Sequence, residues 1–294
     1  MRPLALLALV SASACTPDFA APSTVTDLRI LAVQAEPPEA QYDDAGIDPV
    51  QVRVLAVDPR DAGPIALHAQ LCAPTDSRRC DGGPTLDLGD QPLNATLLVP
   101  PEVVSQARNS DDLKGLGGIR VQYSFSVQNG GTPVYGSKVL LFSPRGGRPN
   151  RNPLVSQVHV TFDGGPHGDD TLPGGTLELP AGVEFGLRPV LADGSVETYV
   201  TTDLRGNQVT LPEYLRYSFF VTPGAEISGD TADEPLDGGA PLDGLSRLTV
   251  RSGDGGLWIV VRDGRGGESW TEFRWSVEAT QTSSRPVRDR PARR

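Results

Sequence analysis

The residues of this chain most able to do chemistry are three histidines and the carboxylates near them. His167 lies in the segment DGGPHGDD together with Asp163, Asp169 and Asp170. An imidazole among carboxylates is a ligand set that divalent metals accept, so these four residues form a candidate metal site. The alternative for the segment is a solvated turn rich in glycine and aspartate. His68 and His159 alternate with apolar residues, which indicates surface or half-buried strand positions.

A second acidic segment spans residues 223–244, PGAEISGDTADEPLDGGAPLDG, and holds six acidic residues and no basic one. Calcium prefers oxygen ligands, so Ca²⁺ is kept as an alternative cofactor. The spacing lacks the Asp-x-Asp-x-Asp-Gly pattern of a known calcium loop. We therefore interpret the segment as a long, irregular, solvated loop.

Motifs that mark common enzyme classes do not occur in the sequence. HExxH, GxSxG, CxxC, a phosphate-binding Gly-Lys-Ser/Thr loop and a GxGxxG after a strand are all missing. The prediction is a protein without catalysis and without a resident cofactor. The alternative is an envelope hydrolase that uses a pair of carboxylates or the His167 cluster.

All three tryptophans fall near the end of the chain. Trp275 alternates with Phe273 and Val277, which places it in the core. Trp270 lies on the other face of the same strand, and Trp258 sits in a segment whose two faces are both apolar. Because sugars commonly bind flat aromatic rings, Trp258 and Trp270 form a candidate ligand platform. Core or hairpin packing is the alternative.

The N-terminus has the features of an export signal over residues 1–14. MRP supplies a positive charge, LALLALV is an apolar run, and small residues precede Cys15. Seven apolar residues are too few to cross roughly 30 Å of hydrocarbon. Ala12-Ser13-Ala14-Cys15 resembles the lipobox of bacterial lipoproteins, although Ala12 stands where that family usually has leucine. The same small residues also satisfy an ordinary signal peptidase, which would give a secreted protein.

The lipoprotein resemblance implies a lipid on Cys15, which anchors the chain to a membrane and leaves residues 15–24 as a tether. Because Thr16 is not aspartate, the resemblance favours the outer membrane of the cell envelope. The other two cysteines, Cys72 and Cys80, are close enough to pair, and export places them where disulfides persist. Their pairing leaves Cys15 as the odd cysteine, which lipidation explains; intermolecular pairing of Cys15 is the alternative.

Charge excludes one class of partner. Residues 16–279 carry 36 acidic and 20 basic side chains, and so acidic a body is repelled by nucleic-acid phosphates. The last segment, 280–294, is a basic tail with five arginines, which we predict to be disordered. The predicted partners are the membrane, through the anchor, and an envelope protein or glycan.

The body of the chain has the pattern of an all-β protein. Short apolar runs rich in β-branched residues alternate with turns, and the chain has 33 glycines and 27 prolines. VQVRVLAV, residues 50–57, alternates as a strand with one buried face, NGGT after residue 127 predicts a hairpin, and residues 101–109 predict a short helix. We expect two β-sandwich domains, 25–145 and 154–279, joined by a linker over 146–153.

Two stretches resemble the immunoglobulin-like and cadherin-like domains of bacterial cell-envelope lipoproteins. These are LRILAVQAEPPEA followed by VQVRVLAVDP, and LWIVVRDGRGGESW, which is similar to a closing hairpin of such a domain. The resemblance implies two tandem immunoglobulin-like antiparallel β-sandwich domains after the signal peptide and tether. It implies no particular ligand, because this architecture carries many roles. The resulting prediction is a non-catalytic binding or structural module, with a calcium-dependent adhesion or carbohydrate-binding module as the alternative.

Overall fold

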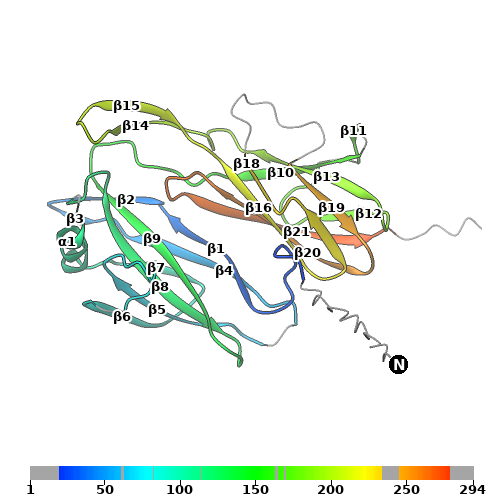
Figure 1. Cartoon of the computed structure of the whole chain (residues 1–294), viewed down its shortest axis with the longest axis horizontal. Helices are drawn as coiled ribbons and strands as arrows, with labels where there is room; N and C mark the ends of the chain where they lie inside the picture. Colours follow the sequence, from blue (N-terminus) through cyan, green and yellow to red (C-terminus); the bar gives the residue numbers. More distant parts are fainter. Residues whose placement is uncertain are drawn as a thin grey trace, which may run out of the picture.

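The computed structural model describes residues 20–60, 63–81, 83–112, 114–162, 165–168, 170–233 and 245–278. These residues form two β-sandwiches that lie side by side (Figure 1). The first sandwich runs from residue 29 to 144 and the second from 155 to 277. Within the described ranges, no helix is long and apolar enough to cross a membrane.

The first sandwich packs a three-stranded sheet against a six-stranded one. The smaller sheet has the order β1 (Arg29–Glu36), β4 (Val50–Val57) and β7 (Asn94–Leu97). The larger sheet has the order β3 (Gly46–Ile47), β2 (Glu39–Asp43), β9 (Val134–Pro144), β8 (Ile119–Gln128), β5 (Ala66–Cys72) and β6 (Thr85–Gln91). The predicted helix is α1 (Pro101–Ser110); Pro101 suits its first turn, and Val104 and Ala107 face the core.

The second sandwich has two five-stranded sheets and an inserted hairpin. One sheet has the order β11 (Gly165–Pro166), β10 (Val155–Phe162), β13 (Glu184–Leu191), β19 (Ser246–Val250) and β17 (Ala225–Ser228). The other has the order β12 (Thr176–Leu179), β21 (Glu268–Val277), β20 (Asp254–Arg262), β16 (Arg216–Val221) and β18 (Thr231–Asp233). The hairpin, β14 (Thr198–Thr202) and β15 (Gln208–Pro212), forms a separate two-stranded sheet.

The strand order is that of the immunoglobulin fold. In one sheet of each sandwich, the last two strands pair with each other and the earlier of them pairs with a middle strand, giving β5-β8-β9 and β16-β20-β21. In the other sheet, the first strand pairs with the next long strand, giving β1-β4 and β10-β13. The pairs are antiparallel with two exceptions: β2 runs parallel to β9, and β12 runs parallel to β21. After Pro37 and Pro38, the chain leaves the sheet of β1 and continues as β2 at the edge of the opposite sheet, where it pairs with β9.

Alternation in β4 matches the sequence prediction on one face and departs from it on the other. Val50, Val52 and Val54 are buried in the first core, whereas Gln51 is exposed. Leu55, which the pattern places on the outer face, is also buried. Its side chain belongs to a cluster between the two sandwiches, the junction cluster, whose buried members are Val25, Leu31, Ala32, Leu55, Trp258 and Val260.

The predicted tether ends earlier than residue 24. Ser23 and Val25 exchange backbone hydrogen bonds with Val221 of β16, at 2.9 and 2.8 Å, and Ser23 is buried. The predicted irregular loop over residues 223–244 is likewise wrong in its first part, because residues 225–228 and 231–233 are strands β17 and β18. Ser228 pairs with Arg247 of β19, and Asp233 with Arg216 of β16. Residues 234–244 lie outside the described residues.

Candidate functional site

Several predicted site residues lie outside the described residues. They include Cys15 with the signal peptide, Asp163 and Asp169 of the candidate metal site, and the basic tail over 280–294. The lipid anchor therefore stays a prediction.

The other two residues of the candidate metal site have different partners. The ring of His167 packs against Phe185, with 4.6 Å between centroids. Asp170 instead pairs with the imidazole of His159 and accepts a hydrogen bond of 2.6 Å from Gln157 Nε2. No group of three or more His, Cys, Asp or Glu side chains that could hold a metal occurs among the described residues.

The predicted platform of Trp258 and Trp270 is instead part of the contact between the sandwiches. Trp258 is buried in the junction cluster, and Trp270 is half-buried against it. The guanidinium of Arg53, from β4 of the first sandwich, lies 4.8 Å from the centre of the Trp270 ring. The expectation of an exposed platform is wrong and the packing alternative holds, because the first sandwich packs against the outer side of β20 and β21 at these residues. Trp275 is fully buried in the second core, as predicted.

The linker between the sandwiches is held by a network of buried charges, the junction network. Arg265 Nη1 lies 2.7 Å from Glu213 Oε1 and 3.8 Å from Glu197 Oε2, and Arg265 Nη2 lies 3.6 Å from Glu39 Oε2 on the first sandwich. The backbone N–H of Asn150 in the linker donates to Glu39 at 2.9 Å. Burial raises the pKa of Glu213 in this network, against the opposing effect of Arg265 and of the Glu197 N–H.

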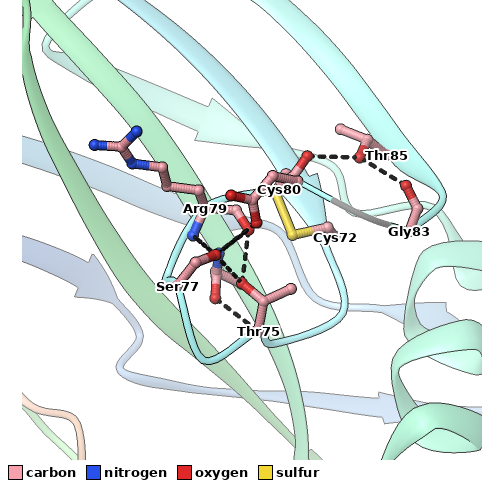
Figure 2. Close-up of a disulfide and its surroundings, with 9 residues drawn as sticks. Cys72, Thr75, Ser77, Arg79, Cys80, Gly83 and Thr85 are labelled. Carbon is pink, nitrogen blue, oxygen red and sulfur yellow. Dashed lines mark hydrogen bonds between the residues drawn. A yellow bond between two sulfur atoms is a disulfide. The ribbon is translucent and has the colours of Figure 1, made fainter.

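The predicted disulfide between Cys72 and Cys80 is confirmed, and it closes a loop at the end of β5 (Figure 2). Hydrogen bonds inside the loop add to this closure. The Thr75 hydroxyl donates to the Arg79 carbonyl at 2.6 Å, and the Ser77 hydroxyl donates to the Asp81 carboxylate at 2.5 Å. The loop therefore has a defined shape.

The disulfide loop lies over the outer face of the larger sheet of the first sandwich. The Thr75 N–H donates at 3.1 Å to Oε1 of Gln122, a buried side chain on the outward side of β8. Beside this contact is a pocket of about 350 Å³, which we call the loop pocket. The loop contributes Arg79, Cys80 and Asp81 to its wall.

Polar residues form the floor of the loop pocket because the strand register places them in rows. One row crosses four strands and consists of directly opposed residues: Asp90, His68, Ser126 and Tyr135. The next outward row holds Asp87, Gln70, Ser124 and Ser137. Opposed side chains on one face of an antiparallel sheet lie close enough to act on one ligand.

Two charged contacts shape the rim of the loop pocket. The two ring nitrogens of His68 face Asp87 and Asp90, at 3.1 and 3.3 Å. The guanidinium of Arg79 lies 4.3 Å from the centre of the Tyr135 ring, which is 56% exposed. His68 has the surface strand position that the sequence predicts, whereas Arg79 and Tyr135 were not predicted as site residues. The sequence signal that could have pointed to this site is the nine-residue segment from Cys72 to Cys80, together with the outward serines of β8.

Comparisons with known proteins give no family. No protein-family model matches this sequence, and no curated protein is significantly similar to it. Solved structures with the same general architecture include the two tandem V-type regions of VCBP3, a v-region-containing chitin binding protein, which is 11% identical over 85% of this chain and 100% of that chain, with a TM-score of 0.29.

Two further solved structures are similar at the same level. The N-terminal Ig1-2 module of the Drosophila receptor protein tyrosine phosphatase DLAR is 12% identical over 86% of this chain and all of that chain, with a TM-score of 0.24. The Escherichia coli adhesin FdeC is 14% identical over 87% of this chain and 67% of that chain, with a TM-score of 0.22. These similarities carry no information about ligands, and the fold assignment rests on the strand pairing described above.

Proposed function

We propose that this chain is a non-catalytic, lipid-anchored protein of the bacterial outer membrane that binds a hydroxyl-rich ligand, such as an envelope carbohydrate, in the loop pocket. The observation that carries the proposal is the polar floor of this pocket, formed by opposed strand residues under a loop that a disulfide closes. A pre-shaped site loses little conformational entropy when a ligand binds.

The chemistry of the pocket suits a polyol better than an apolar or strongly charged ligand. Ser124 and Ser126 offer hydroxyl groups that both donate and accept, and Gln70 offers an amide with both functions. Tyr135 offers an exposed aromatic ring at the rim. Arg79 in the wall is accompanied by the carboxylate of Asp81, and Asp87 and Asp90 lie beside His68 at the rim, so the pocket disfavours an anionic ligand.

The packed connection between the sandwiches supports a role in presentation. The junction cluster and the junction network join them, and Ser23 and Val25 attach the start of the described chain to β16. A lipid on Cys15 would therefore hold both sandwiches through a short segment that begins at their junction. In this arrangement the loop pocket, on the outer face of the first sandwich, remains accessible.

The proposal is tested by binding of the purified full-length chain to an array of bacterial envelope oligosaccharides. We expect Tyr135→Ala to reduce binding about tenfold, which corresponds to about 1.4 kcal/mol. Phe162→Ala is the matched control, because it removes an aromatic ring that is 47% exposed on the second sandwich and should leave binding unchanged.

The same array is measured with Ca²⁺ and with EDTA. The proposed site needs no metal, so binding should be equal in both, whereas binding only with Ca²⁺ would support the calcium-dependent alternative. The proposal would be contradicted if the chain bound no oligosaccharide on the array, or if Tyr135→Ala and Phe162→Ala lost binding to the same extent.

A further inference from the structure

Among the described residues, each outer edge of the β14–β15 hairpin has a row of backbone groups that pair with no other strand. The Asp203 N–H donates to the Asn207 carbonyl, and the Glu213 N–H donates to the Glu197 carbonyl, both at 2.9 Å. Opposed residues alternate between hydrogen-bonded and non-bonded pairs in an antiparallel ladder. The register therefore places the N–H and C=O groups of Thr198, Val200 and Thr202 outward on β14. In the described part of the chain, these groups make no backbone hydrogen bond to another strand.

The β14 edge lacks the devices that usually protect an exposed edge. Such edges are blunted by proline, charged residues or bulges. β15 has Pro212 at an outward position of its edge, and the edge strand β6 has Asp87, Asp90 and a register shift opposite Ala69 and Gln70. β14 has the sequence TYVTT, without charge or proline, and its residue types favour pairing in sheets.

A groove of about 770 Å³ lies between the hairpin and the first sandwich. Figure 1 shows β14 on the side of the hairpin that is nearer to the first sandwich. Residues 199–202 of β14 all line this groove, and four consecutive strand residues can do so only along a backbone edge. The opposite wall contains Val139, Leu141 and Ser143, which share one face of β9. The groove therefore joins a row of free backbone groups to a partly apolar sheet face.

We propose that this groove binds an extended, uncharged peptide segment of a partner protein by strand addition to β14. The backbone of the peptide pairs with Thr198, Val200 and Thr202. Its alternate side chains pack against Val139 and Leu141. A segment of about five residues, roughly 17 Å long, matches the length of β14.

Charge and geometry disfavour two other occupants. Arg120 and Arg265 line the groove with one carboxylate, Glu39, and this positive balance disfavours the chain's own tail over 280–294, which carries five arginines. The two prolines of the tail also cannot donate to a ladder. In a second copy, the β14 edge faces that copy's own first sandwich, so two such edges cannot meet directly. An uncharged foreign strand meets neither obstacle.

The probe is a random seven-residue peptide library displayed on phage and selected on the immobilised full-length chain. We expect selected peptides to have apolar residues at alternate positions and no charged residue among them. A synthetic peptide of the consensus should bind wild type in fluorescence polarisation. Val200→Pro should weaken that binding about tenfold, because it removes one outward N–H from the docking edge.

Thr210→Pro is the matched control, because Thr210 is the residue opposite Val200 and points outward on the other edge of the same hairpin. Its affinity should stay within about twofold of wild type. Val139→Glu tests the opposite wall without altering the hairpin, and it should also weaken binding about tenfold, because a charge replaces an apolar contact. Circular dichroism verifies the fold of each variant.

Four results would overturn the proposal: no enrichment, selected peptides without alternation, equal affinities for Val200→Pro and wild type, or equal losses in the two proline variants. If Val200→Pro does not fold, the proposal is overturned when Val139→Glu binds the consensus peptide as tightly as wild type does. A wild-type dimer in light scattering that Val200→Pro converts to monomer would assign the groove to a second copy instead.

Discussion

Opening the disulfide loop is the sharpest test of how this chain builds its candidate site. We consider the double variant Cys72→Ala and Cys80→Ala in the full-length protein. The two cysteines are eight positions apart, and the loss of loop-closure entropy for a loop of this length amounts to about 2.5 kcal/mol at 25 °C. The free energy of unfolding of the first sandwich should fall by that amount.

The assay is urea unfolding followed by far-UV circular dichroism. With a slope of about 2 kcal/mol per molar urea, the midpoint of the variant should lie about 1.2 M below that of wild type. Wild type under reductant should reproduce this shift, because reduction breaks the covalent link but keeps both sulfur atoms in place. A shift below about 0.3 M in both samples would refute the reasoning. It would mean that hydrogen bonds such as Thr75 to Arg79 hold the loop without the disulfide.

Three further predictions concern the junction and the anchor. Trp258→Ala should destabilise the chain by about 3 kcal/mol in thermal unfolding, because it removes a large buried side chain and leaves a cavity in the junction cluster. A variant as stable as wild type would contradict this role. Burial raises the pKa of Glu213 in the folded chain above its ordinary value of 4.5. The folded state therefore binds the proton more tightly than the unfolded state, and this contribution to the free energy of unfolding is complete below pH 4.5. It is lost as the pH rises through the pKa of the folded state. Glu213→Gln should therefore flatten the dependence of the urea midpoint on pH between pH 4.5 and neutrality, and an unchanged slope would refute it. Cys15→Ser should abolish incorporation of labelled palmitate in bacteria expressing the full chain, whereas persistent label would contradict lipidation at Cys15.

Most central strands could be predicted because they carry a local pattern. β4, β8 and β21 alternate or concentrate apolar residues between turn residues, and that pattern depends only on neighbours in the chain. The edge strands β6, β12 and β18 were missed. They are short or carry several charged residues, as in TLDLGDQ, TLEL and TAD, because an edge strand pairs on one side and remains partly exposed.

The loop pocket could be predicted only in part. The spacing of Cys72 and Cys80, together with the predicted export signal, was enough to expect the disulfide. The meeting of Tyr135 with Ser126 and His68 depends on the register of β5, β8 and β9. That register is set by pairing between residues far apart in the chain, which no local pattern specifies.

The sequence by itself determined the all-β class, the short helix, the disulfide and the acidic character of the body, because each depends on composition or on spacing along the chain. Only the tertiary structure decided what covers the outer faces of the sheets. Leu55 and Trp258 face away from their own cores, and both are buried because the sandwiches pack against each other there. The same packing placed β14 beside β9 and created the groove between them. Whether an outward residue is solvated, buried or part of a site depends on the second surface that approaches it, and such long-range contacts leave no periodic signal in either segment.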